Sequence, residues 1–248
     1  MNHPIDLWAT RPSIWEEDGY LEDRFAAFEG SSEPDRLAEI RLPHRRKEFL
    51  ISHVLLAAAL EDYGISPACV RRDRMGKPFL EGDEGPMSVF FNLSYSEEMI
   101  LCGITRLGRL GVDLESLHRP IDPGPVVKRY FAPIEQEQVL SLDEAAARAR
   151  FFSIWTLKEA FLKGIGTGLR VSVLKCAFSI SSSNKIEVDL SADVPHEAAS
   201  WSFALIDESE CRIGVAFESS DYRSAKFALR RLSPEGEGAL EWLSPLAE

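Results

Sequence analysis

The stretch that decides the fold is FFSIWTLKEAFLKGIGTGL, residues 151–169, in which charged side chains interrupt an apolar helix. Its apolar residues recur at helical spacing and predict one buried stripe, made of Phe151, Ile154, Leu157 and Phe161. Glu159 and Lys163 lie one turn apart on the neighbouring row. The sequence therefore predicts a helix that carries a carboxylate and an ammonium side by side, next to its apolar face.

This helix is predicted over residues 144–163, with Asp143 as its N-cap and Gly164 as its stop. An exposed Glu159–Lys163 pair would contribute only about 0.2–0.5 kcal/mol, and such pairs are common on solvated surfaces. Here the aromatic neighbours leave little polar surface around the pair. A partly buried Glu159 needs a cation, a metal or a hydrogen-bond partner.

A partner for this pair is predicted at residues 111–115, GVDLE. Side chains alternate along a strand, so the two apolar residues point into the core while Asp113 and Glu115 project together from the other face. The alternative is an edge strand with a solvated acidic face. With Glu159 added, the carboxylates would form the hard-oxygen environment that suits Mg²⁺, which Mn²⁺ could replace.

These motifs and a Gly-x-Gly-Leu exit resemble the signature of the 4′-phosphopantetheinyl transferases, specifically the two-lobed, single-chain class that activates carrier proteins. The family pattern is approximately G-[VI]-D-[ILV]-E, then W-[ST]-x-K-E-[AS]-x-x-K, then G-x-G-L. Residues 111–115, 155–163 and 166–169 fit it in order and separation. Upstream matches extend the resemblance over residues 35–180.

The resemblance implies an α+β fold of two lobes related by a pseudo-twofold. Each lobe would be a small, largely antiparallel sheet packed on a long helix, with the active site in the cleft between the lobes. The lobes would be residues 1–108, with the coenzyme A nucleotide contacts, and residues 109–248, with the metal and catalytic residues. Apolar spacing predicts the long helix of the first lobe at residues 45–63, with Gly64 as its stop.

The implied reaction moves 4′-phosphopantetheine from coenzyme A to a serine of an apo acyl or peptidyl carrier protein, releasing 3′,5′-adenosine bisphosphate. Asp113, Glu115 and Glu159 would hold Mg²⁺ against the pyrophosphate. Glu159, or a water that it orients, would take the serine proton. Lys158 and Lys163 would bind phosphate oxygens, and Lys163 is the better placed because it shares a row with Glu159.

Contacts to coenzyme A are implied further upstream. The family uses basic residues just ahead of the first long helix for the 3′-phosphate, which indicates Arg45 or Arg46, although both could simply be solvated. Lys77 and Pro78 belong to a Gly-Lys-Pro turn, where glycine lets the backbone approach the nucleotide and the lysine can meet phosphate.

Residues 90–96, FFNLSYS, are close to the family's F-N-[LI]-S-H-S, in which the serine and histidine touch coenzyme A phosphate. Ser94 fits, but Tyr95 stands where histidine is expected, so a neutral phenol replaces a group that can carry charge. Tyr95 could equally be a packed aromatic at a strand end. This departure puts tight 3′-phosphate recognition in question, though not the reaction.

Residues 126–135, VVKRYFAPIE, resemble the family's A-x-R-F-F-S-x-x-E and make Glu135 a second-tier candidate for the cleft; a solvated glutamate at a helix N-terminus is an equal alternative. Beyond Leu169, four segments are predicted to form an antiparallel sheet: 176–180, 185–190, 201–206 and 211–217. The basic residues Lys226, Arg230 and Arg231 could meet an acidic partner but are predicted to be solvated. The chain from Pro234 onward is predicted to be loosely ordered apart from an apolar clasp of Leu240, Trp242 and Leu243.

Composition limits the other functions. A net charge of −12 over 248 residues argues against a nucleic-acid partner, because proteins that bind phosphate backbones usually carry net positive charge. No apolar run is long enough to span a bilayer, and the N-terminus lacks the pattern of a secretory signal, so we expect a cytoplasmic monomer without a membrane partner. The four scattered cysteines lack ligand spacing and argue against a zinc site.

Two other classes of function remain open. A Mg²⁺-dependent phosphodiesterase or nuclease also clusters carboxylates, but it would hydrolyse rather than transfer, and the net charge disfavours a nucleic-acid substrate. A non-catalytic module that binds coenzyme A or a carrier protein would keep the fold and lose the chemistry. The intact carboxylate and lysine set of the two motifs disfavours such a module.

Overall fold

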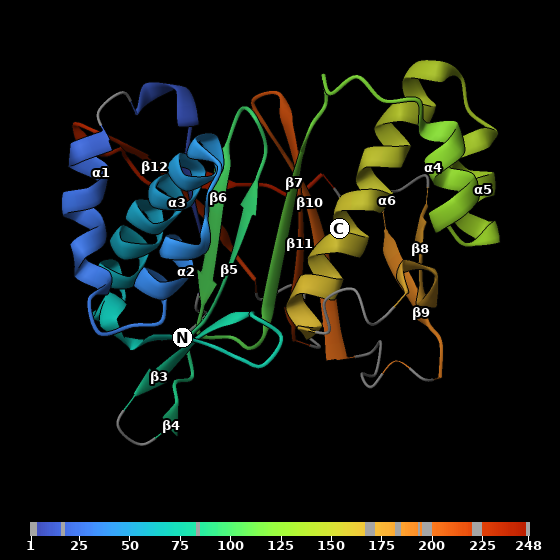
Figure 1. Ribbon diagram of the computed structural model, residues 1–248. Coiled ribbons are helices and arrows are strands. Elements are labelled where there is room, and N and C mark those ends of the chain that lie inside the picture. The colour runs from blue at the N-terminus through green and yellow to red at the C-terminus, as the bar shows by residue number, and fades with distance from the viewer. Residues whose placement is uncertain are drawn as a thin grey trace.

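The computed structural model describes residues 4–15, 18–82, 85–166, 172–181, 185–192, 194, 200–219 and 225–246. It has two halves, each with one long helix lying along a sheet (Figure 1). The first half contains β1 Ile5–Thr10, α1 Asp18–Phe25, α2 Glu33–Glu39, α3 Pro43–Asp62, β2 Val70–Arg72, β3 Pro78–Gly82, β4 Gly85–Pro86, β5 Phe90–Tyr95 and β6 Ile100–Thr105. The second half contains β7 Leu110–Ser116, α4 Pro123–Tyr130, α5 Pro133–Leu140, α6 Glu144–Ile165, β8 Cys176–Ile180, β9 Ile186–Leu190, β10 Trp201–Glu208 and β11 Cys211–Glu218, followed by β12 Phe227–Ser233, β13 Gly236–Glu237 and β14 Glu241–Leu243.

Helix α3 is the centre of the first half. Every residue from Phe49 to Leu60 is buried, because α1 covers one side of α3 and the sheet strands β1 and β6 cover the other. The helix ends as predicted, with Gly64 just beyond it in the left-handed region at φ +70°. The helix predicted at residues 45–63 is therefore present, beginning two residues earlier at Pro43.

Helix α6 has the same place in the second half, against the antiparallel sheet β10-β11-β7. A side chain at Gly111 would overlap the backbone of α6 at Ala160 and Gly164, so the glycine that opens GVDLE allows the strand and the helix to touch. This contact fixes the acidic strand directly beside the helix that carries Glu159.

The ends of α6 confirm one prediction and correct another. Asp143 is the N-cap, its side chain accepting from the backbone N–H of Ala146 at 3.0 Å. The predicted stop at Gly164 is wrong. The helix continues to Ile165 and ends at Gly166, whose φ of +72° suits glycine, while Gly164 packs inside the helix against the ring of Trp201. Of the exit motif, Thr167, Gly168 and Leu169 lie outside the described residues.

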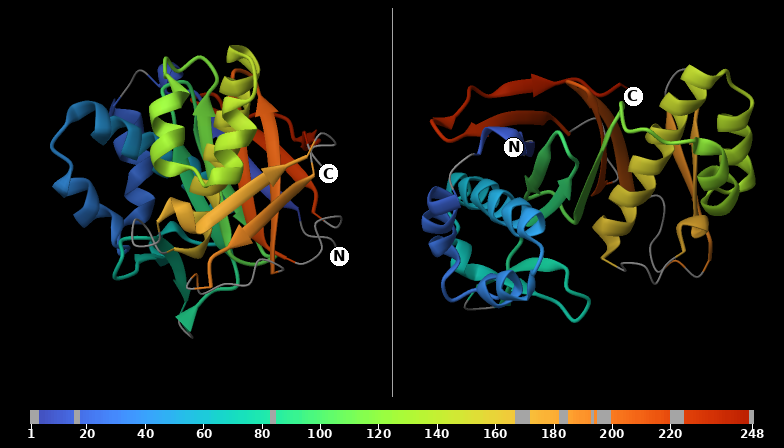
Figure 2. Two further views of the ribbon diagram at one scale, coloured as in Figure 1. Left: turned by 90° about the vertical axis from the view of Figure 1, so that its right-hand side faces the viewer. Right: turned by 45° about the horizontal axis from the view of Figure 1, so that its top comes forward.

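The C-terminal segment returns to the first half. β12 pairs in parallel with β1 in a mixed sheet of order β13-β12-β1-β6-β5, and β14 pairs with β12. Figure 2 shows these late strands beside the first half of the molecule. Residues 236–237 and 241–243 of the tail pair with β12, so the tail is more ordered than predicted, and Trp242 and Leu243 of the predicted clasp lie in β14. The division at residue 108 stays a prediction, although β12 pairs with β1 of the first half.

The α+β class and the two small, largely antiparallel sheets on long helices agree with the prediction, and the pseudo-twofold stays a prediction. The four strands predicted beyond residue 169 are all present, as a β8-β9 pair and as part of the β10-β11-β7 sheet. Over the described ranges, no helix combines the length and the apolar character needed to cross a membrane.

Candidate functional site

Asp113 and Lys163 form the centre of the site, as the sequence predicted from β7 and α6. The Nζ of Lys163 lies 2.6 Å from Oδ1 of Asp113, and the same oxygen accepts from the Ser94 hydroxyl of β5 at 2.9 Å. Asp113 is 7% exposed, so the ion pair is largely desolvated on the carboxylate side. The lysine neutralises a carboxylate that would otherwise be costly to bury.

Ser94 does not have the role that the resemblance implied. It is 1% exposed, and besides donating to Asp113 it accepts from the Lys163 ammonium at 2.9 Å and from the Leu114 N–H at 3.2 Å. A hydroxyl has one donor and two acceptor positions, so all of them are used within the protein. Ser94 orients Asp113 and Lys163, and the expectation that it contacts coenzyme A phosphate is corrected.

A second bridge between β5 and β7 was not predicted from the sequence. The side chain of Asn92 accepts from the backbone N–H of Val112 at 2.9 Å, one pleat away from the Ser94–Leu114 contact. Two polar side chains of β5 thus replace a backbone ladder and join the sheets of the two halves. Asparagine and serine at alternate positions of a buried strand could have indicated this, because they need buried partners.

The other oxygen of Asp113, Oδ2, is buried without a hydrogen-bond partner among the residues that the structure describes. Glu115 and Glu159 are close enough to Asp113 for its negative charge to affect their ionisation. Burial and the charge of Asp113 raise the pKa of Glu159, against the opposing effect of Lys163, and the same two causes raise the pKa of Glu115, against the effect of Arg119. Folding therefore disfavours the ionised form of both carboxyls.

The direction of these shifts has a consequence for stability. The folded state holds these two protons more tightly than the unfolded state does, so their contribution is complete below the unfolded pKa and is lost as pH rises through the raised pKa values of Glu115 and Glu159. A cation placed among the carboxylates would reverse this effect, because it favours the ionised forms.

The donor chemistry fits a hard cation, but the side chains do not close around one. Carboxylate oxygens are the ligands that Mg²⁺ prefers, and the orphaned Oδ2 of Asp113 is a free ligand position. Nevertheless, across the part of the chain that the structure describes, no three His, Cys, Asp or Glu side chains come close enough to hold a metal ion together. Glu115 is turned toward Arg119, with 2.7 Å between its Oε2 and the guanidinium.

Lys158 is a clear correction. It is fully buried, pairs with Glu135 at 2.8 Å, and donates to the carbonyls of Val173 and Cys176 at 2.6 and 2.5 Å. Its three donors are satisfied, so it cannot bind phosphate oxygens. Glu135 is also fully buried, and it is neither a cleft residue nor a solvated helix terminus. The pair ties α5 and α6 to β8.

The two arginines predicted to bind the 3′-phosphate, Arg45 and Arg46, face different parts of the molecule. Arg45 and Tyr95 line a cavity of 370 Å³ together with two arginines that the sequence analysis missed, Arg36 and Arg41. Arg46 points away, to Glu22 of α1, and is absent from the lining of the described cavities. The structure thus separates the two arginines that the sequence could not rank, because Arg45 faces the cavity and Arg46 faces α1.

A larger cavity of 740 Å³ runs between the halves. Tyr95 and Arg45 line it on one side, and Glu115 and Arg119 line it on the other. Because Arg45 and Tyr95 border both cavities, the 370 Å³ cavity opens beside Glu115, the one carboxylate of the predicted site in the lining of the larger cavity. The predicted cleft between the lobes is therefore present, and it joins a basic end to an acidic end.

Lys77 lies where the two halves meet. Its Nζ donates to the carbonyls of Lys163 and Gly164 at 2.6 and 2.8 Å, so it caps the C-terminal end of α6. Burial lowers the pKa of Lys77 to about 8. Lys77 and Pro78 line a third, mostly apolar cavity of 260 Å³. The predicted role of this turn in binding coenzyme A stays a prediction.

Comparison with known proteins agrees with these motifs. The family model of the 4′-phosphopantetheinyl transferase superfamily matches residues 109–216. The 4′-phosphopantetheinyl transferase HetI of Nostoc sp. is 30% identical over 223 residues, which cover 87% of this chain and 88% of that relative. The phosphopantetheinyl transferase of Thraustochytrium sp. is 25% identical over 92% of this chain and 85% of its own length. A holo-(acyl-carrier-protein) synthase of Bacillus anthracis is a weaker structural match, with 22% identity and a TM-score of 0.38 over 45% of this chain and 96% of that chain. From the match to HetI and the family model, the chain belongs to the 4′-phosphopantetheinyl transferase superfamily and is an enzyme of that class.

Proposed function

We propose that this protein transfers 4′-phosphopantetheine from coenzyme A to a serine of an apo acyl or peptidyl carrier protein in the presence of Mg²⁺, releasing 3′,5′-adenosine bisphosphate. The observation that carries the proposal is the Asp113 carboxylate, with one oxygen held by Lys163 and the other orphaned and buried beside two further carboxylates. Such an arrangement is strained by like charge and is relieved by a hard cation.

The residues divide the chemistry between them. Asp113, Glu115 and Glu159 would hold the ion after Glu115 leaves Arg119, and the ion would act as a Lewis acid on the pyrophosphate. Lys163 already donates to Asp113, Ser94 and the Val112 carbonyl, but its side chain is 30% exposed, so it would exchange one of these bonds for a bond to a phosphate oxygen. Glu159, or a water that it orients, would take the proton of the attacking serine.

The nucleotide end is the arginine-lined cavity. Arg36, Arg41 and Arg45 line a space of 370 Å³ together with Glu39 and Glu48, which pair with Arg36 and Arg45. Planar guanidinium groups bind the oxygens of a phosphate monoester in pairs and would exchange these carboxylates for phosphate. We assign the 3′-phosphate of coenzyme A to this cavity, with Arg45 as the predicted residue and the other two as additions. Cytoplasmic location and a monomeric state stay predictions from the sequence.

The decisive experiment uses the full chain, coenzyme A and a panel of apo carrier proteins, with Mg²⁺ or with a chelator, and measures the mass of the carrier. We expect the mass of one phosphopantetheine group to be added with Mg²⁺ and nothing with chelator. Hydrolysis of coenzyme A or of a phosphodiester without a change in carrier mass would favour the phosphodiesterase. Binding of coenzyme A without any reaction would favour the non-catalytic module.

Tyr95→His tests whether the side chain at position 95 contributes to binding of the 3′-phosphate. Tyr95 is 42% exposed at the cavity, and its hydroxyl donates to Ser52 at 3.2 Å. At pH 6 a histidine with a pKa of about 6.5 would be mostly cationic, so we expect affinity for coenzyme A relative to dephospho-coenzyme A to rise about ten- to hundredfold. At pH 8 the imidazole is neutral and most of the gain should disappear. Calorimetric dissociation constants at both pH values measure this.

The matched control is Tyr20→His on α1, which is exposed to a similar degree, 39%, and is absent from the lining of the described cavities. Tyr20→His should leave the affinity for coenzyme A relative to dephospho-coenzyme A unchanged at both pH values. An unchanged ratio in Tyr95→His at both pH values would mean that Tyr95 only packs and that the arginines alone bind the phosphate.

A further inference from the structure

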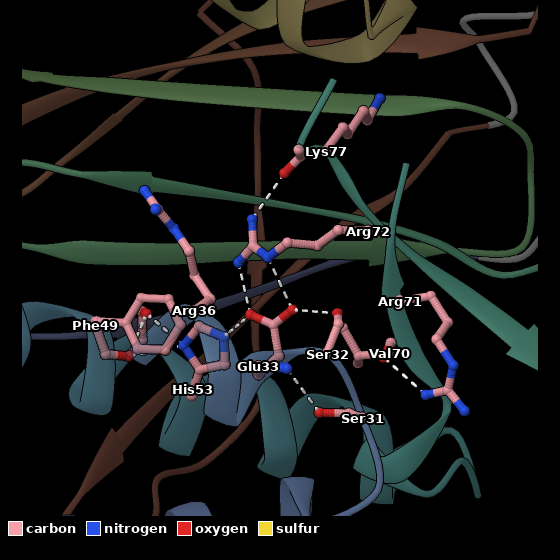
Figure 3. A network of polar contacts seen from close by, with 12 residues as sticks. Ser31, Ser32, Glu33, Arg36, Phe49, His53, Val70, Arg71, Arg72 and Lys77 are labelled. Carbon is pink, nitrogen blue, oxygen red and sulfur yellow. Dashed lines mark hydrogen bonds and ion pairs between the residues drawn. The ribbon is translucent and has the colours of Figure 1, made fainter. Parts of the chain in front are cut away.

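A buried ionic cluster lies outside the carboxylate site and has no part in the reaction proposed above. Glu33, at the start of α2, is fully buried and accepts two hydrogen bonds from Arg72 of β2, at 2.9 and 2.6 Å. It also accepts from Nε2 of His53 on α3 at 2.8 Å. Figure 3 shows Arg72 and His53 pointing toward Glu33 from separate elements.

The histidine in this cluster has a polar contact at each ring nitrogen. Besides the contact of Nε2 to Glu33, Nδ1 lies 2.7 Å from the carbonyl oxygen of Phe49. Phe49 stacks on the imidazole at 3.9 Å between ring centroids. Burial alone would raise the pKa of Glu33, but the bonds from His53 and Arg72 lower it to about 2, so the carboxylate stays ionised.

Helix α2 depends on this cluster for its place. It has seven residues, too few to be stable alone, and among its apolar side chains only Leu37 is buried. Its other buried residue is Glu33. Buried ion pairs generally add little net stability compared with apolar packing, but they do fix geometry. The cluster is therefore the contact that sets the orientation of α2 against α3 and β2.

Orientation matters here because α2 carries Arg36 three residues after Glu33. Arg36 lines the 370 Å³ cavity, and Figure 3 shows it near the cluster without a drawn contact to Glu33. The other wall of the cavity is tied to the same cluster, since Tyr95 donates to Ser52, and the Ser52 hydroxyl lies 3.1 Å from Nδ1 of His53.

We propose that Glu33, His53 and Arg72 are positioning residues that hold Arg36 over the nucleotide cavity and so determine the preference for coenzyme A over dephospho-coenzyme A. This inference rests on the proposed function, in which that cavity receives the 3′-phosphate. None of the three residues is in the lining of the described cavities. Arg72 acts on the guanidinium of Arg36 through Glu33 and α2. A lysine at position 72 would keep the charge but could not make both bonds to Glu33, so it would loosen this link.

The test compares Arg72→Lys with Arg212→Lys in the full chain. Arg212 is a matched control, since it also makes a two-bond contact to a carboxylate, Asp207, at 2.8 Å for each bond, and lies on β11 away from the cavity. Dissociation constants of coenzyme A and its dephospho form are measured by calorimetry, and unfolding by thermal denaturation. Both variants should lose some stability, but only Arg72→Lys should lower the coenzyme A preference, by about tenfold.

The route through Arg36 is tested in a second background. In Arg36→Ala, the coenzyme A preference should already be reduced, and adding Arg72→Lys should lower it no further, because residues that act as a unit are not additive. Independent, multiplying effects of the two substitutions would overturn the proposal. So would an unchanged preference in Arg72→Lys, or an equal loss in Arg212→Lys, since either result means that the cluster only stabilises the fold.

These outcomes are separate from the fate of the proposed function. If the wild type prefers coenzyme A but never modifies a carrier protein, the proposed transfer reaction is wrong. The positioning role is then still decided by the ratio of the dissociation constants of coenzyme A and dephospho-coenzyme A in the variants. If the wild type modifies carrier proteins while Arg72→Lys keeps its binding preference, the function stands and the positioning role is wrong. A wild type without any preference between the two ligands would overturn the positioning role directly.

Discussion

Asp113→Asn should reduce Mg²⁺-dependent transfer on the order of a thousandfold. A metal ion that stabilises developing charge is worth several kcal/mol, and each 1.4 kcal/mol is tenfold in rate. The amide removes the charge and replaces the orphaned Oδ2 by a donor, which repels a cation. Its remaining oxygen can still accept from Lys163 and Ser94, so the melting temperature in chelator should hardly change. Single-turnover transfer and calorimetric titration with Mg²⁺ measure the two effects.

The control is Asp189→Asn on β9, an exposed aspartate that loses the same charge far from the cleft. It should transfer like the wild type. Normal Mg²⁺ binding or normal transfer in Asp113→Asn would show that the ion lies elsewhere. A large fall in melting temperature with chelator present would show instead that the Asp113–Lys163 pair holds the fold, and any loss of activity would then be indirect.

The core of the site could be predicted because local periodicity determined it. A period of 3.6 placed Glu159 and Lys163 on one side of α6, and a period of 2 placed Asp113 and Glu115 on one side of β7. The Asp113–Lys163 ion pair at 2.6 Å agrees with both patterns, because each put its charged side chains on one side of its element.

What failed depended on long-range contacts. Lys158 neighbours Glu159 in the chain, but one residue turns the side chain by 100°, and the element that covers that side, β8, could not be placed from the sequence. Ser94 matched a motif, yet its hydrogen bonds come from α6 and β7. The pairing of β12 with β1 joins residues more than 200 positions apart, which no local pattern predicts.

Glu135→Gln should unfold the protein about 10 °C or more below the wild type, while Glu159→Gln should leave the melting temperature in place and abolish turnover. The carboxylate of Glu135 is surrounded by donors: the N–H of Ala132 at 2.6 Å, the N–H of Phe178 at 2.8 Å, and Lys158. Whichever way the amide turns, its NH₂ faces a donor, and Lys158 keeps a buried charge without a counter-ion. Breaking such a pair costs about 3–5 kcal/mol, and in a chain of this size each kcal/mol lowers Tm by about 2–4 °C.

The matched substitution for this measurement is Glu137→Gln, which removes an exposed charge from the same helix and should shift Tm by little. Lys158→Met in the Glu135→Gln background removes the unpaired ammonium, so the double variant should recover part of the loss and be more stable than Glu135→Gln alone. Below its melting temperature, folded Glu135→Gln should still turn over, because neither member of the pair reaches the cleft. Slow turnover in Glu135→Gln at normal stability would indicate that Glu135 takes part in the reaction. Burial alone would then not distinguish structural from catalytic carboxylates in this protein.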